Sequence, residues 1–600
     1  MNRTRAARLV GALIGSALLL AGCANLPDSS APQALGTLDH QTTSSGPHPP
    51  VAGRDPDLLL HDFLEATADP TDHHKTARQY LSTAAAQSWD DSAGTVVVDK
   101  PDTLRESRSE STATYQIRAR KVGQLGADGT YSPVDDLLES RIEMTRVDGE
   151  WRIDNLPSGV VIDSNAFYKS YRRYAVNFGN SDGTAMVSDL RWLSTSKDQL
   201  TSILMGLLSR GPQAPLAPAV RNTLAQPVTV RGISKGNGDP SGVGVGAGGV
   251  RIDMTGTSGL DAHSRELLAA QVVTTLSGAD VLGPFYFTGD GRPLDDKHAV
   301  SGWTAADVSS YNLGARTSDN VGLHVVRDGA LLKVSDNSVA PVPGYFGAPH
   351  GLQSVGLSED GKLVAAVADS GRGSPAPAQM LIIGSYDGTP FPVAQGNSFT
   401  RPSWTRDGGA AWTVVDGVRV IRAVHDQSSG NVSVQEVDSS GLYAAAPGES
   451  GPIPAHAPIT DLRISRTGAR AAMIIGGKVY VATVVPKPDG KYALTSPQPA
   501  AVSLSTSAVS VDWLDNNTLI VARDGSVDPV QSVGIDGSQP TPFTSRNLTT
   551  PVRVVSASPN AQYVADSRAV MMLQPADPNS ERFWREVQGL GVNVIPVLPG

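Results

Sequence analysis

The sequence predicts a multidomain protein in which two mixed α and β domains precede an all-β domain built from repeats. Three observations predict this fold class. The chain has 600 residues, enough for about three to five domains of roughly 150 residues each. Helical and strand-like stretches alternate up to about residue 300, whereas a strand–turn–strand phrase recurs after about residue 305. The 61 glycines and 42 prolines suit short strands and many turns.

The first 23 residues have the features of a lipoprotein signal peptide. Three arginines within the first eight residues precede residues 9–21, a run of 13 residues without a charge. Such a run is too short to span a bilayer as a helix, and it fits the apolar part of a secretion signal. The small residues Ala21 and Gly22 then precede Cys23, the only cysteine in the chain. We expect cleavage between Gly22 and Cys23 and a diacylglyceryl group on the Cys23 thiol.

A lipidated Cys23 restricts the chemistry of the rest of the chain. No thiol remains for catalysis, disulfides or metal binding. Two or three acyl chains give stable anchoring, at roughly 0.8 kcal/mol per buried methylene. No later segment contains 18 uninterrupted apolar residues. We therefore expect a lipid anchor on the outer face of the cytoplasmic membrane as the membrane attachment.

Composition narrows the function classes. The net charge is −10, and charged residues make up 18% of the chain. A nucleic-acid-binding protein would show basic patches, and none is present in the sequence. Residues 23–53 are rich in Pro, Ser, Thr and Gly, which favours a flexible tether after the lipidated cysteine.

Residues 54–160 form the first expected domain. Apolar residues at helical spacing predict a helix over 55–69 and a second helix over 76–89. Alternating strands follow, with a turn at Asp148-Gly149. Helices before a curved antiparallel sheet resemble the NTF2-like cone, and the segment after that turn resembles its last strand, whose Trp151 packs inside.

Residues 165–300 form the second expected domain. The order is strand, helix, strand, strand, helix, strand, with an amphipathic helix over 197–209 that Gly211-Pro212 ends. This order resembles the GerMN domain, a small extracellular α/β module.

Residues 305–600 contain the repeat. Five phrases share an alternating strand, a turn and a strand rich in Ala, Val and Ile, and their turns are 47, 60, 48 and 44 residues apart. The turn residues are expected to adopt positive φ, and they are Gly361, Gly408, Gly468, Asn516 and Asn560. A repeat of about 45 residues with four strands is typical of a β-propeller. A further hairpin at 322–342 favours six blades, with five as the alternative.

The lipobox, the NTF2-like and GerMN-like regions and the propeller occur together in the LpqB family of actinobacterial lipoproteins, which this chain resembles over its whole length. The resemblance implies a regulatory lipoprotein that acts on the extracellular domain of an MtrB-type two-component sensor kinase. Cell-envelope homeostasis and cell division would be the processes influenced.

Two serine motifs fit catalytic patterns poorly. Ser234 lies in a Gly-x-Ser-x-Gly pattern, but the loop that follows lacks the required helix. Ser194 and Lys197 match Ser-x-x-Lys, but the hairpin-like Ser335-Asp-Asn lies in another domain. We expect Thr195 or Ser196 to cap the helix after them.

Other polar clusters also favour structural interpretations. Gly244, Gly246 and Gly249 precede a strand, where a dinucleotide site needs a helix. A solvated loop is expected around His73 and His74, near His61, where a metal site would need ligands on fixed elements. A charged hairpin edge is expected at Asp135, Asp136 and Glu139. Most tryptophans are expected in the core, with some propeller aromatics lining the tunnel mouth as the alternative.

The sequence thus predicts a non-enzymatic regulatory protein without cofactor or metal. The alternative hypothesis is a propeller that binds or hydrolyses cell-wall fragments. That alternative requires converged carboxylates or a Ser/Lys pair at one end of the propeller tunnel. Cys23 is the one residue to which the sequence assigns a functional role.

Overall fold

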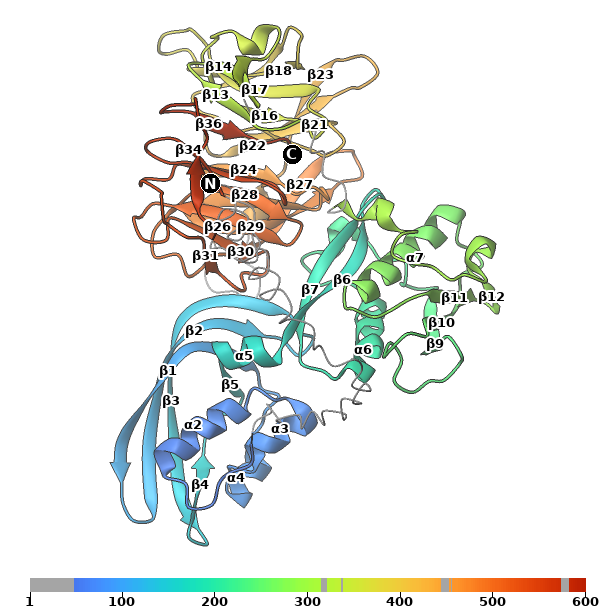
Figure 1. The fold of residues 1–600 in the computed structure, drawn as a ribbon, viewed down its shortest axis with the longest axis vertical. Coiled ribbons are helices and arrows are strands. Elements are labelled where there is room, and N and C mark those ends of the chain that lie inside the picture. Colours follow the sequence, from blue (N-terminus) through green and yellow to red (C-terminus); the bar gives the residue numbers. More distant parts are fainter. Residues whose placement is uncertain (1–47, 314–320, 336–337, 444–452, 455, 574–581) are drawn as a thin grey trace, which may run out of the picture. The chain divides into compact units, whose positions relative to one another are not determined.

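The computed structural model describes residues 48–313, 321–335, 338–443, 453–454, 456–573 and 582–600. Three modules follow one another along the chain: helices with a long-stranded sheet, a smaller α/β module and a series of four-stranded sheets (Figure 1). Among these residues, no helix has the length and apolar character needed to cross a membrane. The predicted signal peptide and most of the tether lie outside the described residues.

The N-terminal module packs helices on one face of a five-stranded sheet ordered β4-β3-β2-β1-β5. Asp55 caps the first helix by accepting the Asp57 N–H at 3.2 Å. The helices are α2 (Pro56–Ala66), α3 (Thr71–Arg78), α4 (Thr83–Ser88) and α5 (Ser164–Ser170). The strands are β1 (Thr95–Arg108), β2 (Thr112–Leu125), β3 (Tyr131–Val147), β4 (Glu150–Asn155) and β5 (Val160–Asp163).

The single helix predicted over 76–89 is wrong, because the structure has α3 and α4 there with a break between them. At the break, Leu81 forms a bridge with Ile153 of β4, and the Ser82 N–H donates to the Ile153 carbonyl at 2.7 Å. Ser82 then caps α4 by accepting the Ala85 N–H. These hydrogen bonds to the sheet replace the intrahelical bonds of a continuous helix.

Aromatic residues dominate the core beneath this sheet. Phe63, Tyr80 and Trp89 pack edge to edge between α2 and the helices that follow. Trp151 of β4 is buried in the same core, as predicted. The turn before β4 also has the predicted conformation, since Asp148 and Gly149 both have positive φ.

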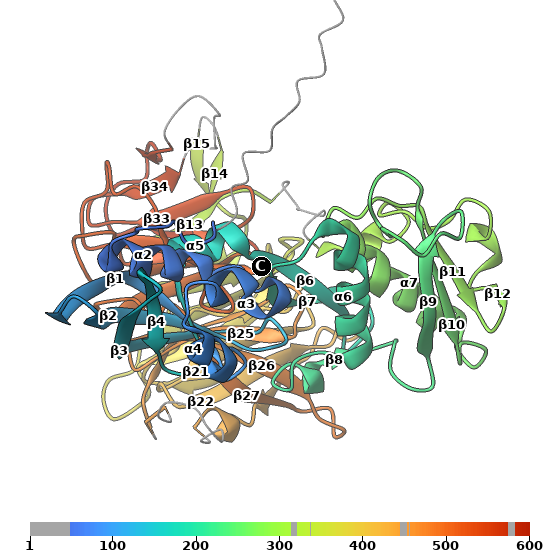
Figure 2. The same ribbon diagram turned by 90° about the horizontal axis from the view of Figure 1, so that it is seen from below.

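The middle module contains two small sheets, β7-β6-β8 and β12-β11-β10-β9. Helices α6 and α7 contact each other and bury their apolar faces against these sheets (Figures 1 and 2). The helices are α6 (Lys197–Arg210) and α7 (Ala262–Ser277). The strands are β6 (Arg172–Asn180), β7 (Met186–Leu193), β8 (Val220–Arg221), β9 (Thr229–Lys235), β10 (Val250–Thr255), β11 (Phe285–Gly289) and β12 (Arg292–Pro293).

Six four-stranded antiparallel sheets make up the C-terminal module, as the six-blade prediction requires. The first strands of the blades contact one another in a closed ring. Blades 1 to 3 are β16 (Leu352–Leu357), β17 (Leu363–Asp369), β18 (Gln379–Ser385), β19 (Phe391–Gly396); β20 (Ser403–Trp404), β21 (Ala410–Val415), β22 (Arg419–His425), β23 (Val432–Glu436); and β24 (Ile459–Ile464), β25 (Arg470–Ile475), β26 (Lys478–Pro486), β27 (Tyr492–Pro499).

Blades 4 and 5 are β28 (Ala508–Asp515), β29 (Thr518–Arg523), β30 (Val530–Gly534), β31 (Thr541–Pro542); and β32 (Val554–Ala557), β33 (Gln562–Ala565), β34 (Val570–Leu573), β35 (Trp584–Glu586). Blade 6 closes the ring with strands from both ends of the module. Its inner strand is the C-terminal β36 (Ile595–Val597), and its outer strands are β13 (His324–Arg327), β14 (Ala330–Ser335) and β15 (Ser338–Pro341). Short 3₁₀ turns occur at Ala217–Ala219, Asp296–His298, Ser309–Tyr311, Tyr345–Gly347 and Ser440–Leu442.

The turns after the first strands agree only in part with prediction. Gly361, Gly408 and Gly468 have the expected positive φ of 70°, 67° and 73°. Asn516 and Asn560 do not adopt positive φ, so that expectation is wrong for blades 4 and 5. Their turns are built differently: in blade 4, Asp515 accepts the Asn517 N–H at 2.7 Å, an Asx turn that needs no left-handed residue.

Candidate functional site

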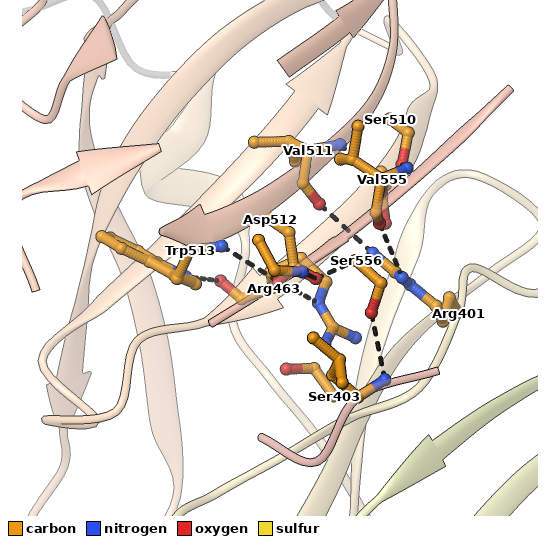
Figure 3. A network of polar contacts seen from close by, with 12 residues as sticks. Arg401, Ser403, Arg463, Ser510, Val511, Asp512, Trp513, Val555 and Ser556 are labelled. Carbon is orange, nitrogen blue, oxygen red and sulfur yellow. Dashed lines mark hydrogen bonds and ion pairs between the residues drawn. The ribbon is translucent and has the colours of Figure 1, made fainter. Parts of the chain in front are cut away.

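Buried charges fill the axis of the propeller, where the inner strands of blades 2 to 5 meet (Figure 3). Arg463 of β24 donates from Nε to Asp512 Oδ1 of β28 at 3.1 Å, and from Nη1 to the Pro402 carbonyl at 3.0 Å. The other oxygen of Asp512 accepts the Ala557 N–H at 3.2 Å. A single carboxylate thus connects blades 3, 4 and 5.

A second guanidinium completes this network. Arg401, just before β20, donates to the carbonyls of Val555 at 3.0 Å and Val511 at 3.3 Å (Figure 3). It lies 3.6 Å from Asp512 Oδ2. Burial lowers the pKa of Arg401, and the positive charge of Arg463 lowers it further. Both cations therefore depend on Asp512 for compensation of their charge.

Side chains at equivalent positions of the inner strands connect each blade to the next. Ser403 accepts the Ile464 N–H, and Ser556 accepts the Leu598 N–H, both at 3.0 Å. The Trp513 indole donates to the Arg463 carbonyl at 2.9 Å. These hydrogen bonds satisfy backbone groups that the short inner strands leave unpaired. The axis network is therefore suited to holding the blades together.

The axis carboxylates are not arranged for acid–base chemistry. Asp461 accepts the Val511 N–H at 3.0 Å and the Ser510 hydroxyl at 3.3 Å, and Asp512 lies between two guanidinium groups. Both carboxylates are buried and have their oxygens hydrogen-bonded. A general acid or base needs a carboxyl that can reach substrate. Within the described part of the chain, this network does not supply one.

The propeller tryptophans are core residues, as most were predicted to be. Trp404, Trp412, Trp513 and Trp584 are all buried, and the Trp404 indole donates to the Gly356 carbonyl of the neighbouring blade at 3.0 Å. None of these four lines a tunnel mouth, the alternative that the sequence left open.

A tryptophan of the middle module contacts all three modules. Trp192 of β7 packs against Phe167 and Tyr131 of the N-terminal module, with ring centroids 5.0 and 6.3 Å apart. Its indole donates to Asp536 of the propeller at 3.0 Å. Trp192 is buried. One side chain therefore joins the N-terminal core to blade 4.

Arg191, next to Trp192, forms the charged part of this junction. Its guanidinium is buried, donates to Asp189 at 2.8 Å, and also bonds Asp128 of the N-terminal module. Burial acts to raise the pKa of Asp128, but the Thr130 hydrogen bond and the Arg191 charge hold it below its usual value. On the propeller side, Arg470 donates to the Ser188 carbonyl at 2.7 Å. These contacts predict that the modules move together.

The residues singled out in the sequence are placed as follows. Cys23 and Gly22 lie outside the described residues. Ser234 lies within β9, paired with Arg251, so no strand–turn–helix elbow exists there. Ser196 occupies the N-cap of α6 but makes no side-chain capping bond, so the expected cap is wrong in its hydrogen bond. Ser335 and Ser338 pair across a hairpin, whose Asp336 and Asn337 are outside the described residues.

The glycine and acidic clusters match their structural interpretations. Gly244, Gly246 and Gly249 all have positive φ and lead into strand β10. Asp135, Asp136 and Glu139 pair with Arg120, Lys121 and Arg118 at 2.8, 3.0 and 3.3 Å. They form the charged strand edge that the sequence predicted.

The histidine segment differs from prediction. His73 is exposed, but His74 is buried with its ring 5.8 Å from that of Trp89, so it does not lie in a solvated loop. Burial lowers the pKa of His74, which favours its neutral form. No cluster of three or more potential metal ligands occurs among the residues that the structure describes.

Sequence reasoning missed both the axis network and the junction. The contacts of Arg463 with Asp512 and of Trp192 with Asp536 join residues 49 and 344 positions apart. One signal was present: polar residues recur in the otherwise apolar inner strands, at Ser403, Arg463, Asp512 and Ser556. Buried polar residues in repeated strands indicate contacts between repeats.

Comparisons with known proteins agree with this module order. Residues 49–168 match the family described as "Lipoprotein LpqB, N-terminal domain". Residues 174–295 match "Sporulation and spore germination", and residues 329–599 match "Lipoprotein LpqB beta-propeller domain".

Full-length relatives share the same description. "Lipoprotein LpqB" of Nocardia farcinica is 56% identical over 99% of this chain and 100% of its own length. The proteins of that name from Rhodococcus opacus and Mycobacterium tuberculosis are 47% and 39% identical, over 99% and 97% of this chain and 98% and 97% of their own lengths. The chain therefore belongs to the LpqB family of lipoproteins.

Proposed function

We propose that this chain is a lipid-anchored, non-enzymatic protein on the outer face of the cytoplasmic membrane that binds and modulates the extracellular domain of an MtrB-type sensor kinase. The observation that carries the non-enzymatic part is the propeller axis, a usual ligand position, which is occupied by paired and hydrogen-bonded charges. Cys23 would carry the lipid. The family membership supports the anchoring, and the family resemblance suggests the kinase as partner.

The outer face of the N-terminal sheet is a suitable surface for this partner. Strands β1, β2 and β3 are 14, 14 and 17 residues long, and one face of their far ends is exposed. Exposed charges of both signs alternate there with two exposed leucines, Leu104 and Leu137, of which Leu137 is 72% exposed. A mixed-charge surface with apolar side chains suits a partner that binds reversibly.

The alternative function, hydrolysis of cell-wall fragments by the propeller, has less support. It requires two convergent acid–base groups with access to substrate. In the described residues, Asp461 and Asp512 are buried and bonded at the axis, and Ser194 and Lys197 lie in a different module from the propeller.

Binding of the mature chain carrying Cys23→Ser to the purified kinase extracellular domain, followed by biolayer interferometry, tests the proposal. We expect saturable binding that Arg118→Glu and Leu137→Asp each weaken about tenfold, since both side chains lie on the outer face. Arg292→Glu, an exposed charge reversal on β12, is the matched control and should leave the affinity unchanged. No binding by the parent chain would overturn the proposal, whereas binding that these variants leave intact would overturn the assigned surface alone.

A further inference from the structure

A cavity of about 270 Å³ lies where the turns of blades 3, 4 and 5 approach the first strand of the middle module. Its lining residues are Arg173 of β6, Arg466, Asp515, Asn516, Asn517, Thr518 and Pro559. Arg466, Asp515 and Pro559 belong to the turns that follow the inner strands, so the cavity lies at one end of the propeller axis. It shares no residue with the buried axis network.

Two arginines of this cavity make no hydrogen bond or ion pair with the described residues. They are Arg173 and Arg466, which are each partly buried. The corresponding arginine of blade 2, Arg406, contrasts with them because its Nε lies 3.0 Å from Glu359. Burial lowers the pKa of Arg466, although a guanidinium stays charged at neutral pH. Two sheltered cations without partners favour the entry of an anion.

The remaining lining is polar and can bind hydroxyl groups. Asn517 Oδ1 is buried and has no hydrogen-bond partner, so it is available to a donor. Asn516 and Thr518 are partly buried beside it. Asp515 is the one acid of the lining, and one of its oxygens accepts the Asn517 N–H at 2.7 Å. The lining therefore combines two cations and one anion with amide and hydroxyl groups.

We propose that this cavity binds a phosphate monoester or diester of a small hydroxylated molecule. The phosphate group would lie between Arg173 and Arg466, whose planar guanidinium groups match phosphate oxygens bidentately. A hydroxyl of the ligand would donate to Asn517 Oδ1. Glycerol phosphate has this chemistry, either free or as the headgroup of phosphatidylglycerol. Because Arg173 belongs to β6 and Arg466 to the propeller, the bound anion would also connect two modules.

Isothermal titration calorimetry on the mature chain carrying Cys23→Ser tests the site. The probes are inorganic phosphate, glycerol 3-phosphate and, as a neutral control, glycerol. We expect glycerol 3-phosphate to bind more tightly than inorganic phosphate, with an affinity that falls as salt is raised. Arg466→Gln and Arg173→Gln should each weaken binding at least tenfold. Arg172→Gln is the matched control, since Arg172 is exposed and does not line the cavity.

Flotation with vesicles distinguishes the two sources of the phosphate group. Sedimentation of the chain with phosphatidylglycerol vesicles but not with phosphatidylcholine vesicles, lost in Arg466→Gln, would assign a lipid headgroup. Binding of glycerol 3-phosphate without vesicle binding would assign a soluble ligand. Thermal unfolding identifies any variant that fails to fold, and the two arginines belong to different modules, so one variant suffices.

Either of two results would overturn the proposal: absence of binding by all phosphate probes, or binding that neither arginine substitution weakens. The site is independent of the proposed kinase interaction. Affinity for the kinase extracellular domain, measured on Arg466→Gln, should be unchanged, so failure here leaves that proposal standing.

Discussion

Asp512 is the residue on which the buried charges of the propeller axis depend. Removing its carboxylate leaves Arg401 and Arg463 without compensation, since both lie in the interior. We predict that Asp512→Ala lowers the free energy of unfolding by about 3–5 kcal/mol. Urea denaturation followed by tryptophan fluorescence measures this change.

An exposed ion pair provides the comparison for that prediction. Asp135 pairs with Arg120 at 2.8 Å, but its side chain is 49% exposed. Asp135→Ala should cost less than about 1 kcal/mol because solvent screens the pair. Equal effects of Asp135→Ala and Asp512→Ala would contradict the role given to the axis network.

His324 makes the stability of blade 6 depend on pH. Its Nε2 lies 2.7 Å from the Tyr386 hydroxyl and its Nδ1 3.2 Å from the Gly322 carbonyl, and burial lowers its pKa to about 4. Because the folded-state pKa lies below the unfolded value of about 6.5, the stabilisation is present above pH 6.5. It is lost as the pH falls from about 6.5 to about 4.

The expected loss over this window is up to about 3 kcal/mol. We predict that His324→Gln, which keeps a polar group but cannot titrate, reduces the difference in unfolding free energy between pH 7 and pH 4.5. His61→Gln, on the exposed face of α2, should leave that difference as in the parent chain. A His324→Gln variant with an unchanged pH profile would show that another group controls it.

Closure of the propeller depends on β36, an element of three residues. It pairs with β13, and Leu598 donates its N–H to Ser556 of blade 5. We predict that removing residues 595–600 opens blade 6 and accelerates amide hydrogen exchange in β13, β16 and β32. Removing Gly600 alone should change exchange little outside Leu357, whose carbonyl accepts the Gly600 N–H. Unchanged exchange after the longer deletion would contradict ring closure by this strand.

Elements were predictable from the sequence where local pattern decided them. The strand at 172–180 and the helix after Ser196 follow from periodicity and a glycine stop, and both formed. The helix over 76–89 failed because Leu81 bonds to Ile153, a contact that no local pattern reveals. The blade repeat was readable since each turn is local, whereas the charges at the axis pair only after the ring closes.

At the scale of the whole molecule, attachment to the membrane rests on Cys23, which lies outside the described residues. We predict that Cys23→Ser moves the protein from the membrane fraction to the soluble fraction and abolishes the mass increase of an acylated N-terminus. Membrane fractionation with mass spectrometry of the N-terminal peptide measures both. An acylated, membrane-bound Cys23→Ser protein would contradict the anchor.

The junction at Trp192 and Arg191 gives the three modules a basis for acting together. Buried side chains of β7 contact both the N-terminal core and blade 4. A partner bound to the outer sheet would therefore encounter a connected molecule rather than an isolated domain. Those interactions connect the surface assigned to the kinase with the propeller.

Site-specific photo-crosslinking in living cells tests the proposed function most directly. A photoreactive amino acid at Leu137, on the outer face of the N-terminal sheet, should form an adduct with the sensor kinase. The same amino acid at Val300, which is 91% exposed on the middle module, should not. An adduct of equal yield at both positions, or no kinase adduct at Leu137, would contradict the account.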